Sequence, residues 1–184
     1  MGNGKEPIEW IILKVDNERA YLLSRYALDN GAYKKGKKVY LWEQSELRRW
    51  LNETFYNNAF SEDEKILLVE MEVYDYKDMV TVFSTDETWQ YNPEILLCKP
   101  SQYTLENNTV NVNTSGNCTW VLRNVAISKE VGVINGEGKR DYKNQNDLYA
   151  IRPVICVGVD YLLKSNSLSE QAIVNNIELF TFPY

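Results

Sequence analysis

The chain has 184 residues, of which 44% are hydrophobic, and a formal net charge of −6. This length predicts a single domain over residues 1–184 with one sizeable core. The negative charge would repel a phosphate backbone, which argues against nucleic-acid binding. The sequence contains no histidine, and this excludes Ser-His-Asp and Cys-His catalysis as well as histidine-bound zinc. Its 13 tyrosines and 5 tryptophans suit strands, interfaces and sugar stacking.

The three cysteines, Cys98, Cys118 and Cys156, form no C-x-x-C motif, so no metal knuckle is indicated and no metal or cofactor is expected. We expect three buried small side chains, although one disulfide with a free thiol would also fit. No run of 18 or more apolar residues occurs, so no membrane-spanning segment is predicted. The first residues, MGNGKEP, show no signal peptide and resemble a trimmed start.

The N-terminal third predicts a β-hairpin followed by the strongest helix of the chain. The hairpin comprises strands at 8–15 and 19–24 around an Asp16-Asn17 turn. The helix is SELRRWLNETFYNNAF, residues 45–60, which Ser45 can cap. Its apolar residues recur with helical spacing on one face, namely Leu47, Trp50, Leu51 and Phe55.

The middle of the chain predicts two short capped helices, two strands and a loop. Ser61 with Glu64, and Ser84 with Glu87, match the Ser-x-x-Glu capping box, in which each side chain satisfies a free backbone N–H group. The strand-like segments are residues 66–74 and 79–83. Residues 104–117 are rich in asparagine and predict a long irregular loop.

The C-terminal part predicts further strands. Residues 130–142 read as a hairpin with Asn135-Gly136 at its turn, where both residues tolerate positive φ. Residues 148–159, LYAIRPVICVGV, form a near-continuous apolar run that is typical of one central strand. Residues 175–184 predict an added strand.

Trp120 and Arg123, in the segment CTWVLRNV, are the first candidate site. A ligand-binding interpretation gives Trp120 a stacking face and Arg123 a fork of donors for a sugar or carboxylate. A structural interpretation places Trp120 in the core and lets Arg123 fix a loop to the sheet, and this is the more usual outcome. Arg152, before Pro153 in an apolar run, is expected to be structural for the same reason.

Carboxylate pairs give a second class of candidate. Asp75 with Asp78, or Glu70 with Glu72, would need to face one cleft at roughly 5–10 Å for glycosidase chemistry. Glu70 and Glu72 alternate along a predicted strand and most simply form its solvent-exposed face.

Seven motifs in order resemble a bacterial family of domains of unknown function, common in secreted and surface proteins of gut Gram-positive bacteria. They are PIEWIILKV (7–15), YLLSRYALD (21–29), ELRRWLNETFYNNAFSEDEK (46–65), DMVTVFSTDE (78–87), CKPSQY (98–103), WVLRNV (120–125) and AIRPVICV (150–157). The resemblance covers residues 7–158 and leaves residues 159–184 as a C-terminal extension.

The resemblance implies an α+β fold that is C-type-lectin-like in its C-terminal half, as in formylglycine-generating enzymes. It implies a twisted, mostly antiparallel sheet, two or more helices and long irregular loops. The family usually has a doubled aromatic and a Ser-Pro-Gly, where this chain has Thr119-Trp120 and residues 124–126, Asn-Val-Ala. Sugar-binding lectins hold calcium through motifs that this chain lacks, but Asn144, Asn146 and Asp147 form an oxygen-rich loop.

These observations predict a non-enzymatic binding module that recognises a glycan or a surface protein outside the cell or at the cell envelope. Its expected ligand-binding residues are Trp120, Arg123, Asn144, Asn146 and Asp147. One alternative is a carboxylate- or thiol-dependent enzyme in which Cys118 and Cys156 approach each other to hold copper. Another is a scaffold domain that binds no ligand.

Overall fold

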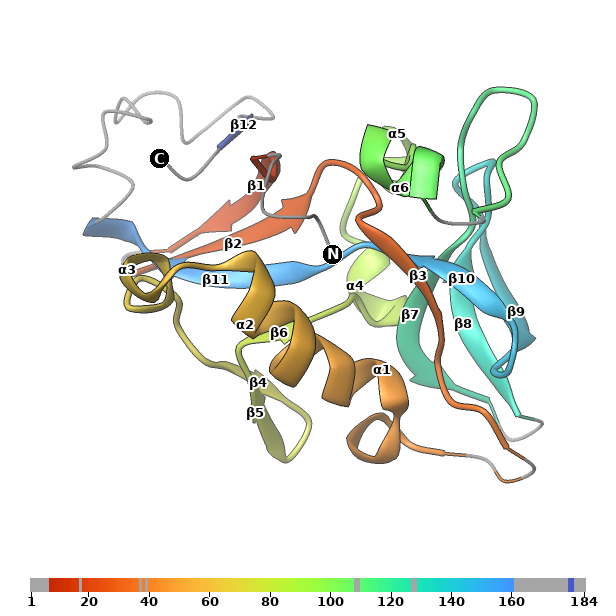
Figure 1. Ribbon diagram of the computed structural model, residues 1–184, viewed down its shortest axis with the longest axis horizontal. Helices are drawn as coiled ribbons and strands as arrows, with labels where there is room; N and C mark the ends of the chain where they lie inside the picture. Colours follow the sequence, from red (N-terminus) through yellow and green to blue (C-terminus); the bar gives the residue numbers. More distant parts are fainter. Residues whose placement is uncertain are drawn as a thin grey trace.

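The computed structural model describes residues 7–16, 18–36, 38, 40–107, 110–126, 129–160 and 179–180. Within these residues the chain is a mixed α+β protein whose strands are mostly antiparallel (Figure 1). The predicted α+β class is therefore confirmed. The single twisted sheet was wrong, because the described strands form two five-stranded sheets and a separate two-stranded hairpin.

The first sheet has the strand order β12-β1-β2-β11-β6, and all of its neighbours are antiparallel. Its strands are Trp10–Val15 (β1), Arg19–Ser24 (β2), Val80–Thr81 (β6), Val154–Gly158 (β11) and Leu179–Phe180 (β12). The N-terminal hairpin is confirmed, although Asn17 of its turn lies outside the described residues. Of the strand predicted over 175–184, only β12 is described, and it pairs with β1.

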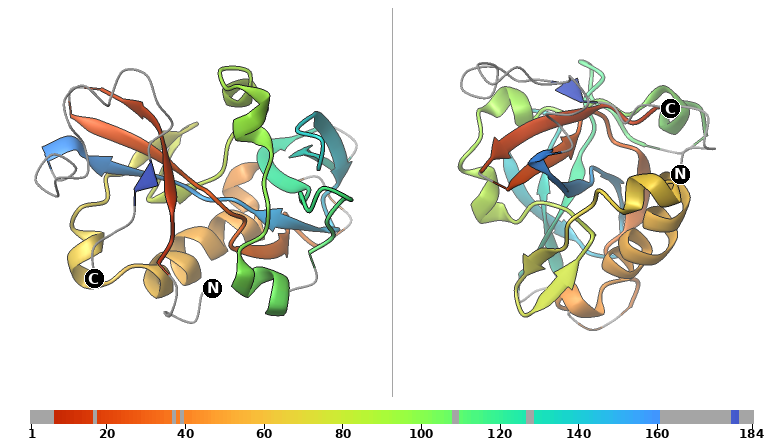
Figure 2. Two further views of the ribbon diagram at one scale, coloured as in Figure 1. Left: turned by 90° about the horizontal axis from the view of Figure 1, so that it is seen from above. Right: turned by 90° about the vertical axis from the view of Figure 1, so that its left-hand side faces the viewer.

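The second sheet has the order β3-β10-β7-β8-β9. Its strands are Asp29–Ala32 (β3), Trp120–Val125 (β7), Glu130–Ile134 (β8), Arg140–Asn144 (β9) and Leu148–Ile151 (β10). The contact between β10 and β7 is parallel, and the other contacts are antiparallel. Figure 2 shows this sheet beside the first one, with the blue segment of β10 and β11 leading from one to the other.

Two chain segments cross together from one sheet to the other. β2 continues into β3 while β10 continues into β11, and backbone hydrogen bonds from Ser24 to Pro153 and from Leu28 to Ile151 join the two crossings (Figure 1). The prediction of one strand over 148–159 is therefore wrong. Pro153 has no N–H to donate to a ladder, so the run breaks at this residue and supplies a strand to each sheet.

One continuous helical segment runs over residues 46–59, along the lower side of the molecule in Figure 1. It follows a short 3₁₀ turn, and its bounds are Trp42–Gln44 (η1), Glu46–Arg49 (α1), Trp50–Phe55 (a π-helical stretch, η2) and Tyr56–Ala59 (α2). Ser45 caps it by accepting the N–H of Arg48. The predicted apolar stripe is buried at Leu47, Leu51 and Phe55, and Trp50 is half-buried.

Four short helices and one small hairpin complete the described fold. They are Glu62–Lys65 (α3), Thr85–Thr88 (α4), Pro93–Leu96 (α5), Gln102–Asn107 (α6), and Met71–Val73 (β4) with Tyr76–Asp78 (β5). Both capping boxes are confirmed, at Ser61 with Glu64 and at Ser84 with Glu87. No helix among these described elements is long and apolar enough to cross a membrane.

Three local predictions were wrong. Residues 66–69 lead out of α3 and form only an isolated bridge, so the strand begins at Met71. The loop expected over 104–117 begins as helix α6, which Ser101 supports by accepting the N–H of Thr104. The hairpin predicted over 130–142 is confirmed, since β8 pairs with β9, but its turn has the positive φ, +76°, at Gly138 and not at Asn135 or Gly136. Asn135 Oδ1 accepts the N–H groups of Glu137 and Lys139 within this longer turn.

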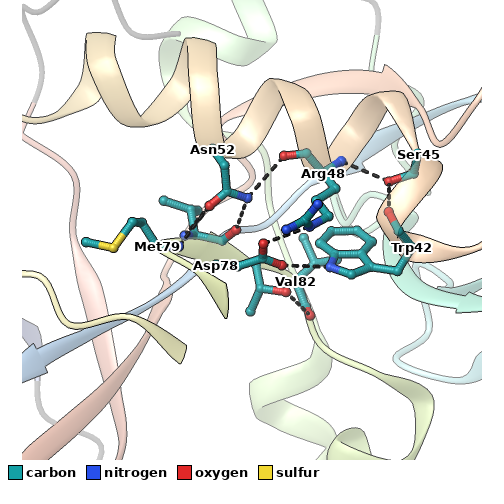
Figure 3. A network of polar contacts seen from close by, with 9 residues as sticks. Trp42, Ser45, Arg48, Asn52, Asp78, Met79 and Val82 are labelled. Atoms are coloured by element: carbon teal, nitrogen blue, oxygen red, sulfur yellow. Dashed lines mark hydrogen bonds and ion pairs between the residues drawn. The ribbon is translucent and has the colours of Figure 1, made fainter. Parts of the chain in front are cut away.

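A buried carboxylate attaches the long helix to the rest of the fold (Figure 3). Asp78 is 1% exposed, and it accepts hydrogen bonds from Trp42 Nε1 at 2.8 Å and Arg48 Nε at 2.7 Å. One turn further along, Asn52 Oδ1 accepts the backbone N–H groups of Met79 and Val80. The side chains of Arg48 and Asn52 thus hold residues 78–80, where β5 ends and β6 begins, in a fixed position against the helix.

Candidate binding site

The first predicted site is a buried structural arrangement. Trp120 is 0% exposed, and its Nε1 donates to the carbonyl of Leu96 at 2.9 Å. Its ring also contacts Phe83. Trp120 therefore has no face open to a ligand in this conformation.

Arg123 also serves the fold. Its Nη1 donates to the Val82 carbonyl at 2.5 Å, and its Nη2 pairs with Glu87, the carboxylate that closes the capping box of α4. Tyr74 lies over the guanidinium at 5.7 Å. The Arg123 Nε has no hydrogen-bond partner among the described residues. Arg123 thus ties α4 to β7, as the structural interpretation of the sequence proposed.

Arg152 occupies the crossing between the two sheets. It is 1% exposed, donates to the carbonyls of Ser24 at 2.8 Å and Ile95 at 2.5 Å, and stacks on Trp120 at 5.3 Å. Burial lowers the pKa of this guanidinium from its ordinary value. Carbonyl dipoles and an aromatic face stabilise its charge, and no described carboxylate forms an ion pair with it.

The second predicted site, the turn between β9 and β10, divides into two parts. The Asn144 Oδ1 accepts two hydrogen bonds from Asn146, one from its backbone N–H and one from its side-chain Nδ2. The Asn146 Oδ1 accepts the N–H of Gly36 at 2.7 Å, which attaches this turn to the loop after β3. Both asparagine oxygens already have donors, and only Asp147 of the three lines a hollow.

This hollow, of about 180 Å³, lies where β10 meets β3, the segment before β7, and β9. Apolar surface comes from Val110, Leu148 and Ala150, and the hydrogen-bonding groups come from Asn30, Asn111, Thr119, Lys143, Asp147 and Tyr149. The lining thus combines apolar residues with amide, hydroxyl, ammonium and carboxylate groups. This combination is typical of a small recognition site.

The polar groups at the hollow influence one another. The Tyr149 hydroxyl donates to the Asn144 carbonyl at 2.8 Å, and burial, aided by the Asp147 carboxylate, raises the pKa of Tyr149. Lys143 and Asp141 form an exposed ion pair at 2.9 Å. Their mutual hydrogen bond raises the pKa of Lys143 and lowers the pKa of Asp141. Near neutral pH the hollow therefore presents a neutral phenol and a cation.

The cysteines do not form the pair required by the copper hypothesis. Cys118 lies beside Cys98, and its N–H and its Sγ both donate to the Cys98 carbonyl, at 2.8 and 3.2 Å. Cys156 lies on β11 of the first sheet, where it pairs with Tyr21 of β2. No cluster of three or more His, Cys, Asp or Glu side chains suited to a metal occurs among the residues that the structure describes.

All three thiols are expected to resist alkylation near neutral pH until the chain unfolds. Each is at most 1% exposed, burial raises the pKa of Cys156 to about 11, and the Cys98 hydrogen bond with burial raises that of Cys118. The hydrogen bond with Cys118 and the charge of Arg152 lower the pKa of Cys98, so burial alone keeps this thiol from the reagent. Because the thiolate is the reactive species, native protein should take up essentially no iodoacetamide. Mass spectrometry with and without denaturant checks this. One thiol that reacts rapidly in the native state would instead favour the thiol-dependent enzyme.

The predicted carboxylate pairs do not form either, because Asp78 and Glu70 are bound to basic side chains of the same chain. Asp78 is buried against Arg48, so it does not face a cleft with Asp75. Glu70 forms an ion pair with Lys77 at 3.5 Å on the exposed face of the β4–β5 hairpin. Sequence reasoning found Asp147 in the hollow but missed the residues that face it, since they come from distant segments without a shared motif.

Comparison with known families supplies one match. The family model described as a domain of unknown function, DUF6273, matches residues 17–159, which nearly coincides with the region 7–158 delimited by the sequence motifs. Comparisons with curated proteins and with solved structures gave no match. The matched region contains the β2–β11 core, the helix of residues 46–59 and every residue that lines the hollow. The chain therefore belongs to the DUF6273 family of domains of unknown function.

Proposed function

We propose that this domain is a non-enzymatic binding module that recognises a glycan or a surface protein through the hollow beside β10. The observation that carries the proposal is the lining itself, which combines the charged groups of Asp147 and Lys143 with apolar residues such as Val110. Carboxylate and ammonium groups give directional hydrogen bonds, and the apolar lining residues can contact a flat ring or a side chain.

The size of the hollow limits what it can hold. Its volume of about 180 Å³ is below the roughly 300–1,000 Å³ of pockets for drug-sized ligands. It therefore suits one sugar ring of a longer glycan, or one side chain of a partner protein. Affinity would come from this anchor together with contacts on the surrounding loops.

The wider setting of the proposal rests on the sequence resemblance. A C-type-lectin-like arrangement of the second half agrees with the mostly antiparallel sheets. An extracellular or cell-envelope location in a bacterium rests on the resemblance alone. The enzymatic alternative has less support, because the groups that it needs are buried and bonded within the fold: Cys98, Cys118 and Asp78.

Asp147→Asn is expected to weaken ligand binding about tenfold, since a charge-assisted hydrogen bond contributes roughly 1.5–3 kcal/mol. Binding partners would first be identified on a glycan array and with cell-surface protein extracts, and affinities then measured by titration calorimetry. Asp75→Asn, in the exposed turn between β4 and β5, is the matched control and should bind like wild type. The proposal fails if neither ligand class binds saturably, or if both variants bind equally well.

A further inference from the structure

A second candidate site lies at the other face of β9, around an exposed tryptophan. Trp89 follows α4 and is 69% exposed, whereas Trp10, Trp42 and Trp120 are at most 1% exposed. The guanidinium of Arg140, on β9, stacks on the Trp89 ring with its central carbon 3.6 Å from the ring centroid. An exposed indole held by a stacked cation keeps one orientation and is therefore ready to bind.

The arginine is fixed by one edge only. Its Nε donates to Thr88 Oγ1 at 2.8 Å, and its Nη2 donates to the Thr88 carbonyl at 2.5 Å. Thr88 is itself 0% exposed, and its hydroxyl donates onward to the Thr85 carbonyl at 2.6 Å. The hydroxyl hydrogen is committed to Thr85, so Thr88 Oγ1 can only accept from Arg140. The guanidinium is thus held by a buried, fully oriented chain of hydrogen bonds.

This attachment leaves the end of the guanidinium fork unused. The Nε and Nη2 hydrogens that bind Thr88 form its side edge, whereas the outer Nη1 and Nη2 hydrogens form its end edge. No described carboxylate forms an ion pair with Arg140. A planar fork with two parallel N–H donors matches a carboxylate bidentately. Arg140 therefore has the geometry to bind one carboxylate of a ligand.

Neighbouring groups favour a sugar as the bearer of that carboxylate. Tyr142 is 43% exposed and lies two residues along β9, so its side chain points to the same face as Arg140. Gln90 is also exposed beside Trp89. A phenol and an amide can bond sugar hydroxyls, and the indole can stack on a pyranose ring. A peptide strand would instead bind the backbone edge of β9 and would not need the Arg140 fork.

We propose that Trp89, Arg140 and Tyr142 form a site for acidic oligosaccharides, in which a uronic-acid carboxylate pairs with the end edge of Arg140 and a neighbouring sugar ring of the same chain stacks on the face of Trp89 that Arg140 leaves open. This site is separate from the hollow, because Arg140 and Tyr142 alternate along β9 with Asp141 and Lys143, and only Lys143 lines the hollow. It therefore does not depend on the function proposed above.

The test is titration calorimetry of the full chain with a galacturonic-acid oligosaccharide and with the matched neutral galactose oligosaccharide. We expect the acidic oligosaccharide to bind at least tenfold more tightly and to weaken with added salt. Arg140→Lys keeps the charge but loses the fork, and it should lower affinity about tenfold. Trp89→Ala should abolish binding, whereas Arg49→Lys, on the exposed side of the long helix, should bind like wild type.

Several results would overturn the proposal. They are equal binding of both oligosaccharides, wild-type affinity in Arg140→Lys, an absence of binding at millimolar ligand, and tighter binding of an acidic peptide than of the sugar. Because Trp89 is exposed, its removal should leave the melting temperature nearly unchanged, and Trp89→Phe should bind with intermediate affinity. Asn111→Trp, which fills the hollow, should not alter this binding, so failure of either site can be recognised separately.

Discussion

Arg48→Met is expected to lower the free energy of unfolding by about 3–5 kcal/mol, the usual cost of removing one partner of a buried ion pair. The variant keeps most of the apolar stem of Arg48 but leaves the Asp78 carboxylate, 1% exposed, with Trp42 Nε1 as its only remaining donor among the contacts in Figure 3. Urea denaturation monitored by circular dichroism measures the loss.

Two further variants separate the ion pair from the helix itself. Arg48→Met combined with Asp78→Asn should recover part of the stability, because no uncompensated charge is left inside the protein. Arg49→Met changes an exposed neighbour on the same helix, and it should shift the free energy of unfolding by less than about 0.5 kcal/mol. Equal losses in Arg48→Met and Arg49→Met would show that the network does not anchor the helix.

Arg152→Ala is expected to cost about 4 kcal/mol of unfolding free energy, since it leaves buried carbonyls without a donor and creates a cavity beside Trp120. The affected carbonyls belong to Ser24 and Ile95. Arg152→Met should cost less, because its side chain fills more of the space. Chemical denaturation measures both variants, and Arg49→Ala is the exposed control. A loss in Arg152→Ala no larger than in this control would contradict the assigned role.

The features that sequence predicted correctly depend on neighbours along the chain. Helical spacing of Leu47, Leu51 and Phe55 identified the long helix, and Ser-x-x-Glu spacing identified the caps at Ser61 and Ser84. These patterns follow from the geometry of a single helix and need no knowledge of the rest of the fold.

The errors and omissions depend on contacts between distant segments. Residues 148–159 are apolar throughout, so periodicity could not show that Pro153 divides them between two sheets. The sequence around Trp120 is equally compatible with a ligand-binding tryptophan and with a core tryptophan. Only the packed fold shows that its side chain is 0% exposed. The hollow joins side chains from β3, the segment before β7, β9 and β10, and Asp147 alone was found beforehand.

The central claim, that the hollow beside β10 binds the ligand, is tested most directly by blocking it. Asn111 is exposed at its rim, so Asn111→Trp should fill the hollow without disturbing the core. Thr114→Trp is the matched control, because Thr114 is exposed in the same loop and does not line the hollow. Affinity for the best glycan or protein ligand is measured by titration calorimetry. We predict that Asn111→Trp loses binding at least tenfold and that Thr114→Trp retains it. Wild-type affinity in Asn111→Trp would contradict the account.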